Sequence, residues 1–579
     1  VKMQVIKKFN DISWSKSVLY QLRRMSSTVE NPVVDLPGLG SLRGSTTTGA
    51  WTGRRIYQFL GVKYAEAPIG ERRFKAPVPI APWEGVKDAT KYGTPPPSYN
   101  NILTLPKEKV SSKLEDCINL CVYSSDLSAS KPVMVYIHGG GFFTGSAAQH
   151  PPNYLLEKDI VLVVPQYRLG PLGFLSTMSD TIPGNAGALD VILAFEWVQK
   201  YIQHFGGDPK QVTAFAQSAG ATLLSALTFS DLVREDLFSK AILSSSASFA
   251  TWCYDHNCVS NARDIAKRSG CSKQASLDEV NDFLMKADAK TLVASHMSHM
   301  AAGTPNGINT IGGHRITVGG PSNLLADTTF NLMRKGKGRR NLPLLAGIAK
   351  HDATFLMTGL CDIFLHTVGY ENHKFNKFQL IDMINKTLGS DEQTGALAAL
   401  ATMTLFDIDA RTKGDFYAML DGLFDLSGIL VIKGPVLREV QYHLSRNKTP
   451  TYLYAFDYEG EHTRFGYGED TSKYPFDGGV AHSDDNIYLF PWPKEVAKLN
   501  EEDNKIAKKM VDLWTSFAIN GVPTSPDVAS WPAMENIAGP YLHIDKECKV
   551  SDNYYDEFKV IGKEKRNLKR NKHLLLDAK

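Results

Sequence analysis

The stretch VTAFAQSAGATLL, residues 212–224, places four strand-forming residues before a small-x-Ser-x-small turn and good helix formers after it. This order is typical of a nucleophile elbow, in which a serine takes strained backbone angles and its neighbours must be small. Ala216 and Gly220 are both small, so Ser218 is a candidate nucleophile. Ala216 stands where the pattern usually has glycine, and the adjoining helix must leave room for its methyl group. A pattern this short also arises by chance, so the rest of the chain has to support it.

The chain on both sides of this stretch alternates short apolar runs with helical patterns. Apolar residues from Leu189 to Phe205 recur at steps of three or four, which predicts a helix that ends at Gly206-Gly207. Alternation with nearly continuous apolar strands predicts an α/β fold, whose mostly parallel central sheet is flanked by helices on both faces. Functional residues are then expected at the carboxyl ends of the strands. The strand candidates are Val133 to Ile137, Ile160 to Tyr167, Val212 to Phe215, Ala241 to Leu243, Leu344 to Ile348 and Thr451 to Phe456.

A serine nucleophile needs an imidazole to accept its proton and a carboxylate to orient that imidazole. Asp352 lies in AKHDATF, directly after the expected strand Leu344 to Ile348. His482 lies in FDGGVAHSDDNIYLF, after the expected strand Thr451 to Phe456. The order serine, acid, histidine is the one expected for this kind of elbow. Taken singly, an aspartate after a strand is often a helix cap, and the chain has 15 histidines.

The sequence HGGGF directly follows the expected strand Val133 to Ile137. Charge that develops on a carbonyl oxygen needs fixed hydrogen-bond donors, and glycines let a backbone approach a substrate closely. The N–H groups of Gly140 and Gly141, with that of Ala219 after the candidate nucleophile, are therefore candidate oxyanion donors. The glycines could instead form only a tight loop. A phosphate cradle is disfavoured, because neither a G-x-G-x-x-G pattern nor a Walker lysine follows.

Composition excludes several classes of function. Lys plus Arg number 64 and Asp plus Glu 61, so the formal net charge is only +3 and nucleic acid is not an expected partner. No apolar run approaches the roughly 18 residues that a membrane-spanning helix needs, so no transmembrane segment is expected. Neither a metal nor a cofactor is expected. The seven cysteines are too widely spaced for a disulfide scaffold, although Cys258 and Cys271 could close a short loop.

One large domain is expected over residues 25–562, since the chain shows neither an internal repeat nor a long low-complexity linker. Residues 1–24 are basic and contain no apolar core of signal-peptide length, and we interpret them as an extension that is disordered or artefactual. Localisation stays open: a start as given or at Met25 indicates the cytoplasm, whereas a missing upstream signal indicates secretion. Residues 563–579 form a basic tail that is either solvated or a patch for an anionic partner.

Six blocks of the chain carry a resemblance to a known family. They are QFLGVKYAEAPIGERRFKAPVPIAPWEGVKDATKYG (58–93), EDCINLCVY (115–123), VYIHGGGFFTGS (135–146), YRLGPLGFLS (167–176), FGGDPKQVTAFAQSAGA (205–221) and HSDDNIYLF (482–490). In this order they resemble the type-B carboxylesterases, the family that includes the cholinesterases, and more an insect-type esterase than a true cholinesterase. The resemblance implies an α/β-hydrolase fold with a gorge, Ser218 as nucleophile, His482 as base, and Gly140, Gly141 and Ala219 as oxyanion donors.

The chain departs from the family pattern at three places. The usual G-E-S-A-G is AQSAG here; the side chain of Gln217 is expected to point away from the chemistry, which leaves Ala216 as the riskier change. The family's usual glutamate is replaced by Asp352, which is one methylene shorter and must be brought closer by its loop. Cys117 resembles the second cysteine of a family disulfide, but no cysteine precedes it in the chain.

The substrate is expected to be a small apolar ester. The segment TPPPSYNNILTLPKEK has no tryptophan, whereas cholinesterases carry there the indole that receives choline, so acetylcholine is a poor candidate. The resemblance places Phe142, Phe143 and Trp252 in the substrate pocket, although each could equally pack in the core. Two functions remain open: a serine esterase that works through an acyl-enzyme, and a weak or inactive cholinesterase-like binding or adhesion protein. The physiological ester and the oligomeric state stay unknown.

Overall fold

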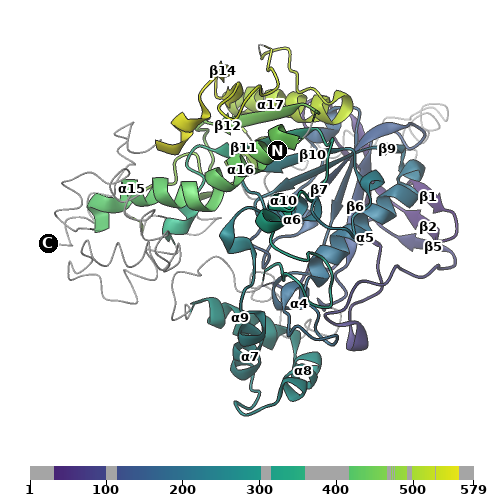
Figure 1. Cartoon of the computed structure of the whole chain (residues 1–579). Helices are drawn as coiled ribbons and strands as arrows, with labels where there is room; N and C mark the ends of the chain where they lie inside the picture. Colours follow the sequence, from purple (N-terminus) through teal and green to yellow (C-terminus); the bar gives the residue numbers. More distant parts are fainter. Residues whose placement is uncertain are drawn as a thin grey trace, which may run out of the picture.

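The computed structural model describes residues 31–98, 114–301, 315–358 and 416–559, apart from 447, 466–470, 472, 473, 475, 492–498 and 529. A mixed sheet of eleven strands forms its centre, in the order β14-β13-β12-β11-β10-β9-β7-β8-β6-β4-β3 (Figure 1). The strands are β3 (Ser45–Thr48), β4 (Arg55–Lys63), β6 (Asn119–Ser124), β7 (Lys131–Ile137), β8 (Val161–Pro165), β9 (Gly207–Gln217), β10 (Lys240–Ser244), β11 (Leu344–Ala349), β12 (Thr451–Phe456), β13 (Tyr541–Ile544) and β14 (Lys549–Ser551). A smaller sheet joins β1 (Val33–Leu36), β2 (Gly40–Arg43) and β5 (Val86–Asp88).

The middle of the large sheet is parallel, from β8 through β7, β9, β10, β11 and β12 to β13. Its edges are antiparallel, with β6, β4 and β3 at one side and β14 at the other. The predicted α/β fold with a mostly parallel central sheet is therefore confirmed. The outermost strands were not predicted because they are short and polar: β3 reads STTT and β14 reads KVS.

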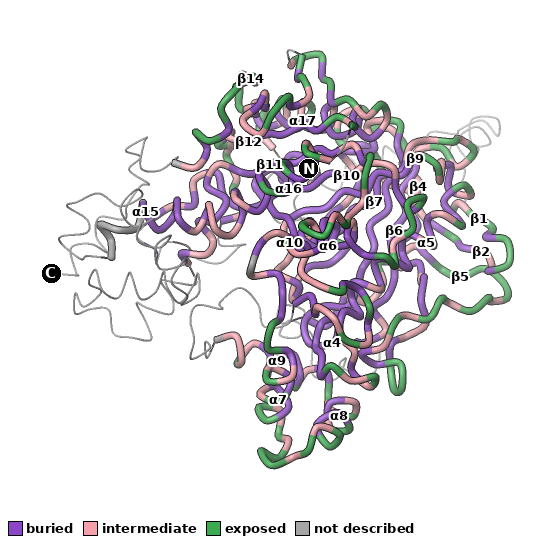
Figure 2. Tube along the Cα trace, in the orientation of Figure 1, coloured by how far each residue is buried: buried purple, intermediate pink, exposed green. Residues whose placement is uncertain are grey.

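Each face of the sheet packs against its own helices, because successive residues of a strand point to opposite faces. In β7, for example, Val135 belongs to one apolar cluster and Met134 to the other. Both faces are covered, so the apolar runs of the central strands are buried, whereas residues near the start of β7 and β9 are partly exposed (Figure 2). This double burial explains why they appear in the sequence as continuous apolar runs. The first cluster includes residues of α5 (Ala186–Tyr201), α6 (Ala219–Leu227) and α16 (Gly434–Arg446), and the second includes residues of α17 (Glu501–Asn520).

The helix predicted from Leu189 to Phe205 is α5, which a 3-10 turn, Ile202–Phe205, extends. Gly206 follows this turn with a φ of 78° and donates its N–H to the carbonyl of Gln203. A left-handed residue at this position is a common helix stop and favours glycine. The predicted helix and its end at Gly206 are both confirmed.

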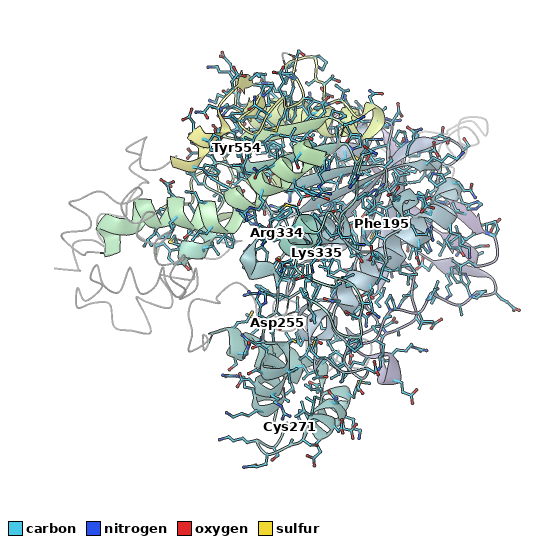
Figure 3. All side chains as sticks on the ribbon, viewed as in Figure 1. Phe195, Asp255, Cys271, Arg334, Lys335 and Tyr554 are labelled. Atoms are coloured by element: carbon cyan, nitrogen blue, oxygen red, sulfur yellow. The ribbon has the colours of Figure 1, made fainter. Side chains whose placement is uncertain are left out.

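Three helices, α7 (Cys258–Arg268), α8 (Leu277–Lys286) and α9 (Ala289–Ala301), lie below the sheet in Figure 1 and share a separate apolar cluster with Phe74 and residues of the 172–182 segment. Cys271 lies at its outer end (Figure 3). Cys258 and Cys271 are not bonded to each other, and all six cysteines in the described part of the chain, Cys117 included, are free. The segments 1–24 and 563–579 lie outside the described residues. Within the described ranges, no helix is long and apolar enough to cross a membrane.

Candidate active site

Ser218 occupies a sharp turn between β9 and α6, with φ 56° and ψ −129°. These angles are strained for a residue with a side chain, and they persist because the surroundings hold them. The Ser218 N–H donates to the carbonyl of Ser244 at 2.8 Å. A Cβ atom on Gly220 would lie 2.3 Å from the carbonyl oxygen of Ile137, so only glycine fits there. The turn at Ser218 therefore has the backbone geometry of a nucleophile elbow, as the sequence predicts.

Ala216 causes no conflict at the position where the pattern usually has glycine. It is fully buried, and it pairs with Ile137 of β7 and Leu243 of β10. Its methyl group belongs to the apolar cluster that also contains α6 residues such as Ala221. The alanine acts here as a core residue and leaves the turn intact.

The structure brings Ser218, His482 and Asp352 together, as the sequence predicts. The Ser218 Oγ lies 2.7 Å from His482 Nε2, and His482 Nδ1 lies 2.5 Å from Asp352 Oδ1. Asp352 is fully buried and His482 nearly so. A carboxylate beside Nδ1 keeps the proton on that nitrogen, which leaves Nε2 to accept the serine O–H. The three side chains thus form a continuous hydrogen-bonded series.

The loops that carry Asp352 and His482 are tied to each other. The N–H of His351 donates to the carbonyl of Val480, and the N–H of Val480 donates to His351 Nδ1, both at 2.9 Å. A Cβ on Gly479, which has a φ of 54°, would lie only 2.4 Å from His351 Nδ1. Glycine at 479 therefore permits a close approach of the two loops. The residues close to Asp352 and His482 in the sequence are thereby joined directly.

The glycine loop after β7 lies directly against the elbow. A Cβ on Gly139 would lie 2.8 Å from the Ser218 Cβ. Gly140 and Gly141 have φ angles of 116° and 60°, which side-chain-bearing residues rarely adopt. Ala219 is the first residue of α6, where backbone N–H groups have no partner within the helix. The three residues predicted as oxyanion donors therefore lie on segments that border Ser218.

The prediction for Gln217 is wrong: its side chain points toward the imidazole. The Gln217 Nε2 lies 3.3 Å from His482 Nε2 and 2.6 Å from Ser483 Oγ, and Gln217 is only 4% exposed. Gln217 shares a face of β9 with Phe215, whose apolar cluster also contains Val480 of the His482 loop. The position of that loop is a tertiary feature, so the sequence around the elbow did not reveal the contact.

The three aromatic residues predicted for the pocket have different surroundings. Phe142 is fully buried, with ring centroids 4.9 Å from Phe174 and 6.2 Å from Trp252, which is the environment of a core residue. Phe143 and Trp252 remain partly exposed. The indole N–H of Trp252 donates to the carbonyl of Val431, in a π-helical turn (Ile429–Lys433) that precedes α16. This bond fixes the orientation of the Trp252 ring.

Two further residues near His482 were missed by the sequence reasoning. The partly exposed ring of Phe355 lies 4.7 Å from the His482 ring, centroid to centroid. Asp485 is buried, and burial, followed by the charge of Asp352, raises its pKa to about 6. The hydroxyl of Tyr454 lies 2.9 Å from Asp485 Oδ2. In the sequence, the only indication for Phe355 and Asp485 was that each follows a predicted site residue by three positions.

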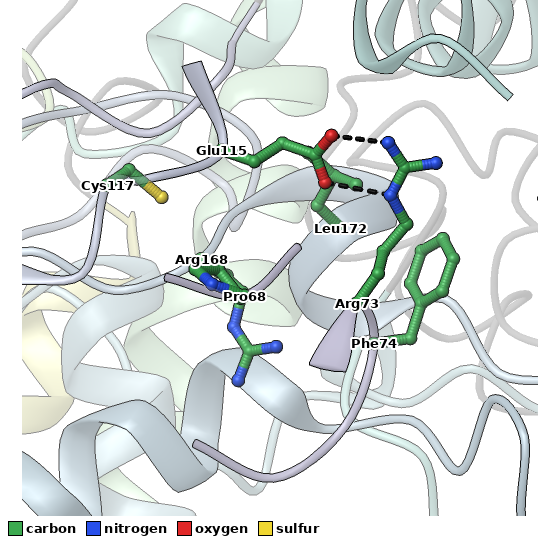
Figure 4. Close-up of a pocket in the computed structure, with 7 residues that line it drawn as sticks. All are labelled: Pro68, Arg73, Phe74, Glu115, Cys117, Arg168 and Leu172. Carbon is green, nitrogen blue, oxygen red and sulfur yellow. Dashed lines mark hydrogen bonds and ion pairs between the residues drawn. The ribbon is translucent and has the colours of Figure 1, made fainter. Parts of the chain in front are cut away.

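A small pocket elsewhere is lined by the ion pair of Arg73 and Glu115, by Arg168, and by Pro68, Phe74, Cys117 and Leu172 (Figure 4). Glu115 accepts hydrogen bonds from Arg73, and Asp190 accepts from Nε and Nη2 of Arg168 at 2.8 and 2.6 Å. Each buried guanidinium is thus neutralised by its own carboxylate, which is the condition for burying such charges. Within the described residues, no group of His, Cys, Asp and Glu side chains has an arrangement that could hold a metal ion.

The sheet order, the elbow at the end of β9 and the loops after β11 and β12 define the class: the protein is an α/β-hydrolase. The model of the carboxylesterase family matches residues 30–560, and the chain therefore belongs to the carboxylesterase family. This confirms the resemblance found in the sequence.

Curated relatives agree with this assignment. Glutactin of Drosophila melanogaster is 29% identical over 534 residues, which cover 91% of this chain but 51% of glutactin, so the chain spans about half of that relative. Esterase FE4 of Myzus persicae is 31% identical over 503 residues, covering 84% of this chain and 85% of FE4. Juvenile hormone esterase of Tribolium castaneum is 31% identical over 516 residues, covering 86% of this chain and 84% of that esterase.

Proposed function

We propose that the protein hydrolyses carboxylic esters through an acyl-enzyme on Ser218. The observation that carries this proposal is the series of contacts from Ser218 Oγ to His482 Nε2 at 2.7 Å and from His482 Nδ1 to Asp352 Oδ1 at 2.5 Å. A serine hydroxyl is a weak nucleophile at neutral pH, and an oriented imidazole within hydrogen-bond reach is what activates it.

In the first step, Ser218 Oγ attacks the ester carbonyl carbon while His482 Nε2 takes the hydroxyl proton. Asp352 stabilises the imidazolium that forms and stays ionised. The bond to the alcohol oxygen then breaks, and His482 returns the proton to the leaving alcohol. Water, deprotonated by the same imidazole, attacks the acyl group and releases the carboxylic acid and free Ser218.

The negative charge on the carbonyl oxygen needs donors that are already in place. We assign this role to the N–H groups of Gly140, Gly141 and Ala219, whose segments border Ser218. Removing one such donor typically costs about 3 to 4 kcal/mol of transition-state stabilisation.

The surroundings of the serine favour an apolar ester. Phe143, Trp252 and Phe355 are partly exposed aromatic residues, and Phe355 lies against the His482 ring. Exposed aromatic surface beside a nucleophile favours apolar acyl or alcohol groups, because both surfaces leave water on binding. Family relatives that are named esterases, such as juvenile hormone esterase of Tribolium castaneum, are consistent with this substrate class.

The alternative function, a binding or adhesion protein without catalysis, does not require the contacts around Ser218. A chain under no selection for proton transfer has no need of a strained serine, an oriented imidazole and three small residues beside them. Their joint presence supports the esterase.

The test is covalent labelling of the full-length protein with a fluorophosphonate, followed by peptide mapping. We expect labelling at Ser218 and none in Ser218→Ala. The matched control is Ser239→Ala, which removes a half-buried serine whose hydroxyl donates to the carbonyl of Val212, and it should label normally. A folded wild-type protein that is not labelled, or a Ser218→Ala variant that is, overturns the esterase proposal in favour of the binding protein.

A further inference from the structure

Gln217 and Ser483 form a buried side-chain pair across two segments that are far apart in the sequence. The Gln217 Nε2 donates to Ser483 Oγ at 2.6 Å, and the two residues are 4% and 3% exposed. Gln217 is the last residue of β9, whereas Ser483 follows His482 and has a φ of 71°. The pair therefore joins the elbow directly to the segment that carries the imidazole.

The same amide nitrogen lies 3.3 Å from His482 Nε2, the atom that also faces Ser218 Oγ at 2.7 Å. One amide hydrogen can bond to Ser483 while the other is directed at the ring nitrogen. Two donors, the Ser218 hydroxyl and the Gln217 amide, thus converge on Nε2. The contact limits rotation and displacement of the ring on the side that Asp352 does not hold.

We propose that Gln217 is a positioning residue, which together with Ser483 holds the His482 imidazole against Ser218 for proton transfer. This assignment rests on the proposed esterase function. Gln217 acts through His482 and Ser483 and takes no part in bond formation. The geometry explains why glutamine can serve at position 217, where G-E-S-A-G has glutamate. The amide supplies the two hydrogens that Ser483 and His482 accept, whereas an ionised carboxylate supplies none.

The uncharged state of Gln217 has a consequence for the pH dependence. Among the described residues, the ionisable side chains that face the ring are Asp352, at Nδ1, and Asp485. A glutamate at 217 would add a further carboxylate beside Nε2, where it would favour the protonated ring. Behind these two carboxylates, the charged or ionisable groups that act on them are Arg464, Lys433, Tyr136, Tyr454 and Tyr554.

A double-mutant cycle tests the pair. The rate of fluorophosphonate labelling is measured for the wild-type protein, Gln217→Ala, Ser483→Ala and the double variant. We expect each single change to lower the rate about tenfold, and the double change to lower it little further, because both remove the same contact. The matched control is Gln199→Ala, which removes a glutamine bonded to the carbonyls of Pro209 and Leu237; Pro209 lies at the start of β9, at the opposite end of the strand from the elbow.

The pH profile separates positioning from mere structural support. In Gln217→Glu, which keeps the side-chain shape, the acidic limb of kcat/KM for an ester should move to higher pH by about one unit. Additive effects in the cycle, or an acidic limb that stays in place, overturn the assignment while leaving the esterase intact. The His482 ring resonances, titrated by NMR in wild type and Gln217→Glu, report the same coupling without a substrate. If the wild-type protein is not labelled at all, the proposed esterase function is overturned. The NMR titration still tests whether residue 217 is coupled to the His482 ring.

Discussion

The acid at position 352 shows how a small chemical change is absorbed by its surroundings. Aspartate is one methylene shorter than the glutamate usual in the family. Its Oδ1 nevertheless lies 2.5 Å from His482 Nδ1, while its Oδ2 accepts the N–H of Ala349 at 2.9 Å. Both carboxylate oxygens therefore have partners, as a fully buried carboxylate requires.

Asp352→Asn should leave a folded protein with very low activity. The amide can present its N–H₂ to Nδ1, which then becomes an acceptor, so the proton moves to Nε2 and the ring cannot take one from Ser218. We expect kcat/KM to fall by about 10⁴-fold, the size seen when this change is made in other serine hydrolases. Ester hydrolysis is measured alongside the thermal unfolding midpoint. Activity within threefold of wild type, at an unchanged midpoint, would mean that another acid serves the imidazole.

Sequence reasoning at this scale succeeded for residues defined by chain order and failed where a contact depends on packing. Ser218, Asp352 and His482 follow expected strands, so their meeting could be foreseen. The direction of Gln217 depends on where the His482 loop packs, and the full burial of Phe142 depends on Phe174 and Trp252. No pattern in the neighbouring sequence predicts the direction of the Gln217 side chain or the burial of Phe142.

At the scale of elements, the contact between the Asp352 and His482 loops depends on Gly479. Gly479→Ala puts a methyl group 2.4 Å from His351 Nδ1 at a φ of 54°. We expect a loss of stability of about 1 to 3 kcal/mol and a larger fractional loss of kcat, since the loops must separate. Urea unfolding and ester hydrolysis measure the two effects.

Gly70→Ala is the matched control for that variant. Gly70 has a φ of 58°, but an added Cβ would meet nothing within 4 Å. Its backbone strain is therefore comparable, whereas the steric conflict is absent. If both variants lose the same stability and both keep full activity, then the close approach of the two loops is not what holds the acid near the imidazole.

A second link between elements joins α16 to the helix that follows the elbow. Glu439 of α16 accepts a hydrogen bond from Ser225 of α6 at 2.5 Å, and burial raises the pKa of Glu439 to about 7 from an ordinary 4.5. Between these values the folded state keeps a proton that the unfolded chain has lost. This contribution to stability is complete below pH 4.5 and is lost as the pH rises through 7.

Glu439→Gln should remove that pH dependence, because the amide does not ionise. As the pH rises from 5 to 8, the unfolding free energy of the variant should increase relative to that of the wild type by on the order of 2 to 3 kcal/mol. Urea unfolding at both pH values measures it. If the unfolding free energies of variant and wild type differ by the same amount at pH 5 and pH 8, then Glu439 is not the source of the pH dependence.

Element boundaries were predictable where the chain carries a physical stop. Gly206 ends the 3-10 turn after α5 because only a left-handed residue satisfies the last carbonyls there. The π-helical turn Ile429–Lys433 has no comparable sequence signal, since such turns depend on contacts such as the one between Trp252 and Val431.

At the scale of the whole molecule, the order of strands and helices was enough to predict the architecture. Continuous apolar runs marked strands buried on both faces, and this held for β7 to β12. The antiparallel edges and the cluster of α7, α8 and α9 were not predicted, because the outermost strands are short and the apolar face of a helix does not indicate which neighbour covers it.

The loops joined at 351 and 480 come from segments that are made late in synthesis of the chain. Ser218 and its imidazole partner are separated by 264 positions, and the acid lies between them. During synthesis from the amino end, Ser218 emerges long before the acid and the imidazole that the proposed mechanism requires. If the three residues act as proposed, the growing polypeptide stays inert toward esters until β12 and the segment after it have docked.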